Sequence, residues 1–437
     1  MENSQLSNSL TSLREAIKEA HDVYARKRPK SAELSTKARQ VMPGGNTRTL
    51  LSYRPFPTAM ARGEGCRLQD IDGNDYLDLC GEYSAGLFGH SERTIHDAIR
   101  GALSNGVSLA AVGAAEEALA RGICSRFSSI DRIRFTNSGT EANIMALTAA
   151  RAYTQRSKVL VFRGAYHGGV LSFPVSGPTT SVPFPFLFGD YNDVEGTLAT
   201  IRDSGSDIAA VIVEPMLGAG GCIPGSPEFI KAIRQATVET GSLLILDEVM
   251  TSRMSTGGMQ RRLGISPDMT TLGKYLGGGM SFGAFGGRRE IMELFAESIP
   301  HAGTFNNNVL SMAAGTAALE VFGDQAANDL FHQGESLRNR LNTACCGTGL
   351  MFTGLGSLIT PHFRPGPIDR PYRAHEREDL LRELFFFDML DAGIYTARRG
   401  MIALSLPVSQ SDLDFYLSSV VEFTKKRAGI IQQSGFE

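Results

Sequence analysis

The sequence predicts an α/β protein with two unequal parts: a large domain built on a mostly parallel sheet, and a small α+β domain formed by both ends of the chain. In the middle of the chain, short apolar runs alternate with longer helical segments, which is typical of strands buried on both faces of a parallel sheet. Toward both ends the pattern becomes mixed. We therefore expect an N-terminal helix and part of the small domain over residues 1–75, the large domain over 76–325, and the rest of the small domain over 326–437.

The N-terminal part begins with a predicted amphipathic helix within residues 10–40. Its apolar residues recur near the helical period, at Leu13, Ile17, Ala20 and Val23. The Pro-Gly-Gly segment at residues 43–45 has the chemistry of a loop. Alternating residues on either side of Asp72-Gly73 predict a β-hairpin that turns at this dipeptide.

The large domain is predicted from four apolar runs and the helical segments between them. The runs are residues 133–135, 159–162, 209–213 and 243–246, and two of the helical segments are 141–153 and 227–239. After residue 325 we expect a helix, a strand, a loop rich in Pro, Arg and His, a second helix, a second strand and a last helix. These elements span residues 326–343, 351–359, 361–375, 377–391, 401–406 and the segment after Ser409.

Composition excludes several classes of function. The 437 residues include 43 Lys and Arg against 46 Asp and Glu, a balance that argues against a surface for nucleic acid or an anionic membrane. Six cysteines form no C-x-x-C pair, so we expect reduced thiols and no metal site. The N-terminal segment lacks the apolar core of a signal peptide, and no apolar run approaches the length of about 18 residues that a membrane span needs. We expect a cytoplasmic protein.

Unusual polar residues follow four of the predicted strands, where open α/β sheets bind ligands. Ser138-Gly139-Thr140 lies between a strand and a helix, so its free backbone N–H groups and the helix dipole favour an anion. The same residues also suit an ordinary helix cap. Tyr166 stands between glycines in a segment that could lie flat on a planar ring, or form an ordinary surface loop.

The other two segments carry ionisable side chains. Asp247 ends an apolar strand, where a carboxylate is costly without a partner such as a cationic ring nitrogen or a structural hydrogen-bond donor. Lys274 also closes an apolar strand and precedes three glycines at residues 277–279. If its amine is partly desolvated, its pKa falls and the neutral amine becomes a nucleophile for carbonyls; otherwise the side chain simply extends to water.

Taken together, the four segments supply what an enzyme of pyridoxal phosphate (PLP) requires. The cofactor's phosphate needs N–H donors, its aldehyde needs an amine with which to form a Schiff base, and its ring needs a stacking partner. An ionised aspartate beside the pyridine nitrogen keeps that nitrogen protonated, so that the ring can act as an electron sink.

At this point the sequence resembles the class III (subgroup II) aminotransferases. The motifs that carry the resemblance occur in the family's order and approximate spacing, and Lys274 follows Asp247 by 27 residues; they are Ser138-Gly139-Thr140-Glu141-Ala142, Tyr166-His167-Gly168, Glu214-Pro215, Asp247-Glu248-Val249, Lys274 and Gly303-Thr304-Phe305. The resemblance covers about residues 40–425. It implies PLP fold type I with a seven-stranded sheet, and a homodimer with both active sites at its interface.

The resemblance also implies a role for each matched residue. Lys274 holds the cofactor and then moves a proton, Asp247 pairs with the pyridine nitrogen, and Val249 and Tyr166 lie on the two faces of the ring. Ser138, Gly139 and Thr140 hold the phosphate, helped by Thr304 of the partner subunit. His167 and Glu214 belong to the cofactor site by their place in the motifs; Glu214 stands where the family often has an acidic residue near the cofactor hydroxyl or the aspartate.

Within the family, the β-amino-acid aminotransferase branch, typified by β-phenylalanine aminotransferase, looks closer than the related glutamate-1-semialdehyde aminomutases. The matching segments are residues 134–143, 271–275, 277–287 and 303–308. Arg48 aligns with the branch's arginine for a substrate carboxylate, in a loop that differs from the mutase loop. Arg399 aligns with a second arginine that receives the acceptor's carboxylate, although adjacent Arg398 could replace it.

The resemblance therefore implies an aminotransferase that works by a ping-pong mechanism. The donor is expected to be a β-amino acid with an aromatic or bulky apolar side chain, and the acceptor a 2-oxo acid such as 2-oxoglutarate or pyruvate. Residues expected near the donor are Leu51, Tyr83, Ala85, Met216, Leu217 and Ala219, although several suit a plain core equally well. Three alternatives stay open: an aminomutase of the glutamate-1-semialdehyde type, an aminotransferase of a specialised biosynthetic pathway, and a non-catalytic protein of the PLP fold, against which the presence of Lys274 and Asp247 argues.

Overall fold

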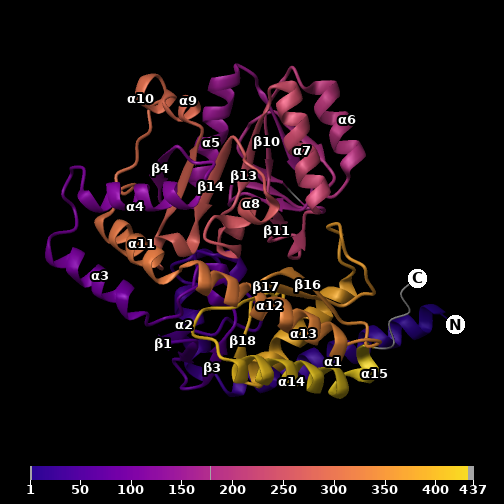
Figure 1. Cartoon of the computed structure of the whole chain (residues 1–437). Helices are drawn as coiled ribbons and strands as arrows, with labels where there is room; N and C mark the ends of the chain where they lie inside the picture. The colour runs from indigo at the N-terminus through magenta and orange to yellow at the C-terminus, as the bar shows by residue number, and fades with distance from the viewer. Residues whose placement is uncertain (1, 178, 432–437) are drawn as a thin grey trace.

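The computed structural model describes residues 2–177 and 179–431. Figure 1 shows two lobes, with the large sheet and its helices in the upper lobe and both ends of the chain in the lower lobe. Among the described residues, no helix combines the length and the apolar character that crossing a membrane requires.

A seven-stranded sheet organises the upper lobe. Its strands lie in the order β4-β15-β14-β13-β10-β5-β9, and all neighbours are parallel except β15, which is antiparallel to both β4 and β14. This confirms the predicted mostly parallel sheet. The strands are β4 (Arg132–Thr136), β5 (Lys158–Phe162), β9 (Phe186–Gly189), β10 (Ile208–Val213), β13 (Leu243–Asp247), β14 (Met269–Gly273) and β15 (Gly283–Gly287).

The four predicted apolar runs are β4, β5, β10 and β13, and all residues of β10 and β13 are buried. Helix α5 packs on β10, β13, β14 and β15, whereas α7 packs on β10 and β13. Sequence reasoning missed β15, which is rich in glycine because a Cβ at Gly283 would lie 2.1 Å from the Ser138 carbonyl oxygen. The helices of this lobe are α3 (Arg93–Ser104), α4 (Ala114–Arg126), α5 (Gly139–Thr154), α6 (Val194–Ser204), α7 (Pro227–Thr240), α8 (Gly258–Leu263), α9 (Arg289–Met292), α10 (Leu294–Glu297) and α11 (Val309–Val321).

Both ends of the chain contribute to the lower lobe. Its four-stranded sheet has the order β1-β2-β3-β18, and β18 from the C-terminal part pairs in parallel with β3 from the N-terminal part. A second sheet has the order β16-β17-β19. These strands are β1 (Met60–Glu64), β2 (Arg67–Asp70), β3 (Asp75–Asp78), β16 (Met351–Leu355), β17 (Leu358–His362), β18 (Ile394–Tyr395) and β19 (Ile402–Ala403).

Two details of the lower lobe differ from the sequence-based expectation. The single strand expected over residues 351–359 is a hairpin, because Gly356 turns the chain with a φ of +52°. Strand β3 crosses the predicted boundary between residues 75 and 76, and the division into domains stays a prediction. The helices are α1 (Glu2–Arg26), α2 (Pro29–Ala38), α12 (Asp324–Ala344), α13 (Glu376–Asp391), α14 (Gln410–Lys426) and α15 (Ala428–Ile431).

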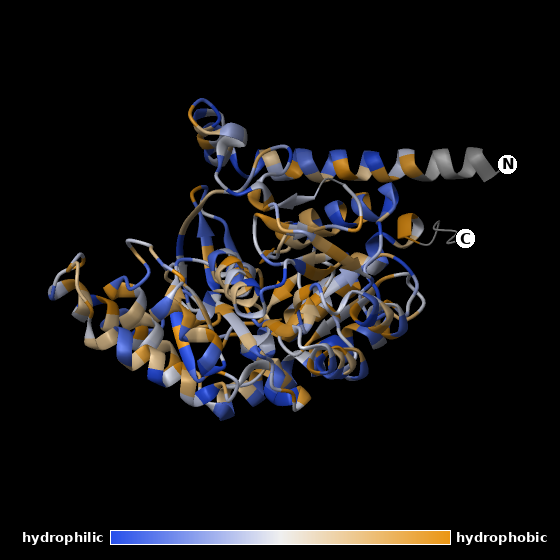
Figure 2. Cartoon of the chain, turned by 90° about the horizontal axis from the view of Figure 1, so that it is seen from above, coloured by the Kyte–Doolittle hydropathy of each residue, from blue (hydrophilic) through white to orange (hydrophobic). Residues whose placement is uncertain are grey.

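Helix α1 lies along the edge of the molecule. Figure 2 shows apolar and polar residues interleaved along it, which is the expected amphipathic pattern. Leu13 and Ile17 are buried, and α1 packs against α13. The N-terminal helix therefore anchors one end of the chain to the C-terminal part.

Several short elements follow the carboxyl ends of the large sheet's strands, where a parallel sheet binds ligands. The remaining short strands and 3-10 helices of the described chain are η1 (Pro43–Gly45), η2 (Thr49–Leu51), η3 (Gly81–Ser84), β6 (Ala165–Tyr166), β7 (Leu171–Phe173), β8 (Thr180–Ser181), β11 (Met216–Leu217), β12 (Ile223–Pro224), η4 (Thr251–Met254) and η5 (Lys274–Gly277).

Candidate active site

Asp247, at the carboxyl end of β13, is the centre of a buried hydrogen-bond network. Its Oδ2 accepts the Nδ1–H of His167 at 2.7 Å and the side-chain N–H of Asn143 at 2.9 Å, and its Oδ1 accepts the backbone N–H of Val249 at 3.0 Å. The Asp247 residue is only 4% exposed. These donors fix the carboxylate in a place where it faces little water, so it is available to a cationic partner.

Sequence reasoning missed Asn143, the buried residue of α5 that orients this network. Its amide also donates to the His167 carbonyl at 2.9 Å, and its Oδ1 accepts the hydroxyl of Thr271 at 2.6 Å. An asparagine in a helix interior gives no clear sequence signal, because its meaning depends on which strand end the helix faces. The only available hint is its position one helical turn after Gly139-Thr140.

The Ser138-Gly139-Thr140 turn begins α5 beside Asp247. The Ser138 hydroxyl caps the helix by accepting the Glu141 N–H at 3.2 Å, so the predicted cap is present. The first backbone N–H groups of a helix lack partners within it and, with the dipole, favour an anion. The turn can therefore cap its helix and receive an anion at the same time.

Gly168 packs directly against this turn. A Cβ at Gly168 would lie 2.2 Å from the Thr140 Oγ1, and its φ of +128° is one that L residues rarely adopt. The neighbouring N–H of Gly169 donates to the same oxygen at 3.2 Å. The two glycines thus set the position of the Thr140 hydroxyl.

Val249 lies between the anion-binding turn and the end of β14. A Cβ at Gly139 would lie 2.8 Å from Val249 Cγ2, and a Cβ at Gly273 would lie 3.3 Å from Cγ1. The valine side chain therefore fills the floor between the Ser138 turn and Lys274, where the sequence predicts an apolar contact with a planar ring.

Glu214 fixes the loop that carries Tyr166. One carboxylate oxygen accepts the Tyr166 N–H at 2.9 Å and the other accepts the Gly218 N–H at 3.0 Å. Burial raises the pKa of Glu214. Tyr166 keeps 43% of its surface exposed, so its ring is open to a stacking partner.

Lys274 follows β14 and points its amine at the chain after β3. Its Nζ donates to the Tyr83 carbonyl at 2.5 Å. Burial is the main cause that lowers the pKa of this amine to about 8, and the positive charges of Arg399 and Arg253 act in the same direction. A lowered pKa leaves more of the neutral amine that attacks a carbonyl carbon.

The turn at Gly81–Ser84, which receives Lys274, has an unusual backbone. All four residues have positive φ values (51°, 47°, 54° and 78°), including the non-glycine residues Glu82, Tyr83 and Ser84. Each such L residue costs about 1–2 kcal/mol, so the surrounding structure must stabilise the turn. No glycine run marks this conformation in the sequence, and sequence reasoning missed it.

Arg48 lies against the same turn. Its guanidinium forms an ion pair with Glu82 and also stacks over the Tyr83 ring, with 5.2 Å between Cζ and the ring centroid. Tyr83 therefore contacts Arg48 through its ring and Lys274 through its carbonyl. Of the predicted substrate residues, Arg48 and Tyr83 are therefore in contact with each other, and Tyr83 also contacts the Lys274 amine.

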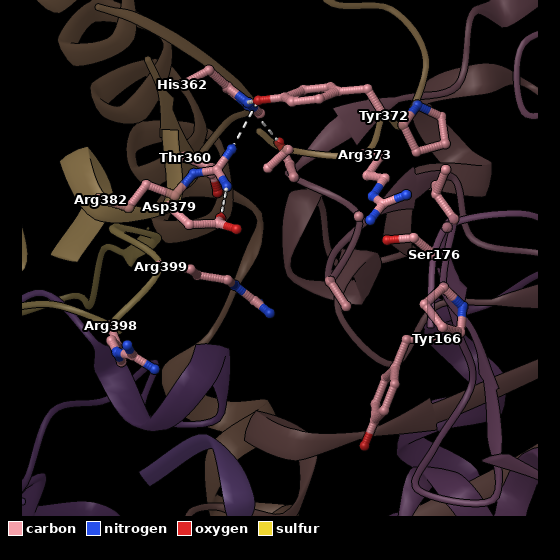
Figure 3. Close-up of a pocket in the computed structure, with 18 of the residues that line it drawn as sticks. Tyr166, Ser176, Thr360, His362, Tyr372, Arg373, Asp379, Arg382, Arg398 and Arg399 are labelled. Atoms are coloured by element: carbon pink, nitrogen blue, oxygen red, sulfur yellow. Dashed lines mark hydrogen bonds and ion pairs between the residues drawn. The ribbon is translucent and has the colours of Figure 1, made fainter. Parts of the chain in front are cut away.

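A cavity of about 730 Å³ opens beside Tyr166 and reaches the loop before α13. Figure 3 shows Arg399 and Arg373 directing their guanidinium groups into it, while His362 and Tyr372 form its far wall. Lys274 and Asp247 do not line the cavity, whereas Tyr166 and Arg399 do.

The charges around the cavity are unevenly paired. Its three carboxylates each contact a cation, in the pairs Glu376–Arg14, Asp379–Arg382 and Glu383–Arg398. Within the described part of the chain, Arg373 and Arg399 have no carboxylate partner, and the buried Nε of Arg399 makes no hydrogen bond. Among the described residues, Arg399 Nη2 contacts only the Met401 sulfur, at 3.2 Å, so Arg399, unlike Arg398, is available to bind an anion.

The structure places the last two predicted site residues apart from this group. Met216 is fully buried in an apolar cluster with Cys80, Cys222 and Met401, against which Tyr83 packs. Thr304 is exposed at the surface, in the same segment as Asn306, whose side-chain oxygen accepts the Asn137 amide N–H at 3.0 Å. Contact of either residue with a ligand stays a prediction.

The groups gathered at this site fit PLP closely. An anion-binding helix start, a shielded carboxylate, an open tyrosine ring, an apolar floor and an amine of lowered pKa meet at one sheet edge, and the buried Nε2 of His167 has no hydrogen-bond partner in the described structure. Within residues 2–177 and 179–431, no group of three or more His, Cys, Asp or Glu side chains is arranged to hold a metal ion. The fold and this set of groups define a PLP enzyme.

Comparison with known proteins gives its family. Residues 51–345 match the model of the family described as aminotransferase class-III. A β-phenylalanine transaminase of Variovorax paradoxus is 47% identical over 94% of this chain and 96% of its own length. A glutamate-1-semialdehyde 2,1-aminomutase of Methanospirillum hungatei is 36% identical over 89% of this chain and 97% of its own. The solved structure of a β-phenylalanine aminotransferase from Variovorax paradoxus superposes with a TM-score of 0.94 at 46% identity, covering 95% of this chain and 98% of that one.

The chain belongs to the class III aminotransferases, and it is a PLP-dependent transaminase of fold type I.

Proposed function

We propose that this transaminase takes its amino group from a β-amino acid with an aromatic or bulky apolar side chain and gives it to a 2-oxo acid by a ping-pong mechanism. The observation that carries the proposal is the contact of Tyr83 with both Arg48 and Lys274. Tyr83 thus links Arg48 to the Lys274 amine, and a donor carboxylate that binds Arg48 replaces Glu82, its present ion-pair partner. The similarity to the β-phenylalanine transaminase of Variovorax paradoxus supports the same donor class.

Around the cofactor, each residue has a role that its position supports. PLP supplies an aldehyde and an electron-withdrawing ring. The Lys274 amine would bind the aldehyde carbon and, once freed, would carry the proton. Asp247, held by His167, would pair with the ring nitrogen, and Val249 and Tyr166 would pack against the ring. Glu214 holds the Tyr166 loop.

The phosphate is bound by the Ser138-Gly139-Thr140 turn together with Thr304 of the partner subunit. The exposure of Thr304 and of the adjacent Phe305 supports a homodimer in which this segment is covered. A molar mass near 94 kDa in light scattering, twice the chain mass of 47.1 kDa, is the expected result. We also keep a cytoplasmic location as a prediction, with no nucleic-acid or membrane partner.

The acceptor binds through Arg399. A guanidinium without a carboxylate partner binds a carboxylate in a bidentate manner. Because Arg373 also faces the cavity without such a partner, a 2-oxo acid with two carboxylates, such as 2-oxoglutarate, fits the cavity's charge better than pyruvate does.

An aminomutase is the second candidate, because the chain is also similar to glutamate-1-semialdehyde aminomutases. The two functions differ in whether a 2-oxo acid is needed. A mutase converts one compound without an acceptor, whereas a transaminase stops after the first half-reaction when the donor is alone.

The experiment follows cofactor absorbance of the purified holoenzyme during incubation with α-, β- and ω-amino compounds. A β-amino acid alone should convert the cofactor once, and 2-oxoglutarate should restore the starting spectrum. In the Arg48→Ala variant, the KM for β-amino acids should rise more than the KM for amines without a carboxylate. Sustained conversion without an acceptor identifies a mutase, and an equal rise for both donor types removes Arg48 from the donor site.

A further inference from the structure

Arg253 is the largest fully buried side chain of the described structure, and it carries a charge without a counterion. It follows Asp247 by six residues, in η4, and is 1% exposed. No carboxylate within the described residues forms an ion pair with it, and its buried Nε has no hydrogen-bond partner. Burying a cation without a partner is costly, so its presence calls for a function that offsets the cost.

The guanidinium of Arg253 is bonded to two backbone carbonyls from separate segments. Nη1 donates to the Ser84 carbonyl at 3.2 Å, and Nη2 donates to the Leu404 carbonyl just after β19. Arg253 therefore connects the end of β13 in the large sheet with the left-handed turn 81–84 and with the lower lobe.

The turn 81–84 needs such support, since Glu82, Tyr83 and Ser84 are non-glycine residues in a conformation that L residues avoid. On its N-terminal side, Asp78 Oδ1 accepts the N–H groups of Cys80 at 2.9 Å and Gly81 at 3.0 Å. On its C-terminal side, the Ser84 carbonyl is held by Arg253. Between these two supports lies Tyr83, whose carbonyl accepts the Lys274 amine.

We propose that Arg253 is a positioning residue that holds the left-handed turn in the conformation in which the Tyr83 carbonyl accepts the amine of Lys274. The inference rests on the proposed role of Lys274 as the group that binds the cofactor and moves the proton. When the amine is free, the Tyr83 carbonyl receives it. Arg253 thereby acts on the proton-transfer step without touching substrate or cofactor.

Ser84 offers a specific test of this coupling. Its φ is +78°, and its buried hydroxyl has no hydrogen-bond partner among the described residues, so Ser84→Gly removes backbone strain without removing a polar contact. If Arg253 acts by holding the strained turn, glycine at position 84 should compensate for the loss of Arg253. If Arg253 acts only through its charge, glycine cannot compensate.

The experiment compares Arg253→Met, Ser84→Gly and the double variant as holoenzymes. Hydrogen exchange is followed in the peptide 79–90, where the Ala85 N–H bonds to the Glu82 carbonyl at 3.2 Å and the Gly86 N–H to the Gly81 carbonyl at 2.9 Å. Single-turnover conversion by a donor is followed by cofactor absorbance. Arg253→Met should increase exchange in this peptide and slow the turnover by about 10- to 100-fold, as expected for a misplaced reacting group. The double variant should recover both.

Arg126→Met is the matched control. Arg126 also donates to two backbone carbonyls, those of Leu319 and Phe322, and neither of them belongs to the turn 81–84. Its loss should leave exchange in peptide 79–90 and the single turnover unchanged. If Arg253→Met does not fold, Arg253→Lys replaces it, because the lysine keeps the charge and cannot span both carbonyls.

Two results overturn the proposal. One is unchanged exchange and turnover in the Arg253 variant; the other is a slowed turnover that Ser84→Gly does not recover although it recovers the exchange. Failure of the proposed function is detected separately, as a wild-type protein whose cofactor absorbance does not change with any donor. In that case hydrogen exchange in peptide 79–90 still shows whether Arg253 holds the turn.

Discussion

Replacing Gly168 with alanine tests whether the Thr140 hydroxyl belongs to the phosphate site. The new Cβ would lie 2.2 Å from Thr140 Oγ1 and 2.7 Å from the Thr140 Cα, and the backbone φ is +128°. A methyl group forced into a packed site costs about 1–3 kcal/mol, and an L residue in a disfavoured conformation costs about 1–3 kcal/mol more. We therefore expect Gly168→Ala to lower the free energy of unfolding of the apoprotein by about 2–6 kcal/mol.

The same substitution should weaken PLP binding beyond its effect on stability, because Thr140 has to move. A hydrogen bond to a charged group contributes about 1.5–3 kcal/mol, so its loss raises the Kd for PLP by about 10- to 150-fold. Urea unfolding of the apoprotein and titration with PLP, followed by absorbance, measure the two effects separately.

Gly169→Ala is the control, since a Cβ at Gly169 meets no atom within 4 Å and the φ of this residue is not in the left-handed range. Its N–H to Thr140 is kept, so both quantities should stay near wild type. Equal behaviour of the two alanine variants refutes the packing argument. Loss of stability in Gly168→Ala with unchanged PLP affinity removes Thr140 from the phosphate site.

Three further predictions concern the reactive amine and the cavity. Borohydride reduction of the wild-type holoenzyme should fix a pyridoxyl adduct on the peptide that contains Lys274, and Lys274→Ala should abolish this adduct and reduce turnover by about 10²–10⁴-fold. Robust turnover by the variant contradicts the proposed role of Lys274. Because burial lowers the pKa of Lys274 to about 8, PLP should add to the apoprotein about tenfold more slowly for each pH unit below 8 and at a constant rate above it; a rate that keeps rising above pH 8 contradicts the lowered pKa. Arg399→Ala should raise the KM for 2-oxoglutarate by about 10- to 150-fold in steady-state kinetics. Arg398→Ala should change this KM little, since Arg398 already pairs with Glu383. A larger KM rise in Arg398→Ala than in Arg399→Ala would assign the acceptor's carboxylate to Arg398 instead.

The parts of the site that follow strands could be predicted from the sequence. Asp247 and Lys274 close apolar runs, and the carboxyl ends of parallel strands meet at one edge of a sheet, so separate motifs become neighbours without knowledge of the side chains. The same argument gives the fold class and the strands β4, β5, β10 and β13. The strand β15 was not predicted, because its glycines are required by a neighbouring backbone that the local sequence does not reveal.

The parts that depend on contacts between distant segments could not be predicted. Asn143 looks like any polar residue of a helix until Asp247 and Thr271 are placed around it. Arg253 looks like a surface residue, because only the fold shows that carbonyls of Ser84 and Leu404 surround it. Left-handed residues at Glu82 and Tyr83 carry no glycine signal, since tertiary contacts rather than propensity stabilise them.

The two lobes contribute different kinds of groups to the site. The edge of the large sheet carries Asp247 and Lys274, the predicted cofactor groups, whereas the chain after β3 carries Glu82, the ion-pair partner of Arg48, and the chain after β18 carries Arg399. With the proposed roles, we expect substrate recognition to change through the lower lobe while the cofactor groups stay fixed. This arrangement requires the lower lobe to keep its position on the sheet edge, and Arg253 is a buried side chain that bonds there to the turn 81–84 and to Leu404 after β19. Variation of the donor within this family is thus expected in the turn 81–84 and the loop before α13, and loss of Arg253 should impair all donors alike.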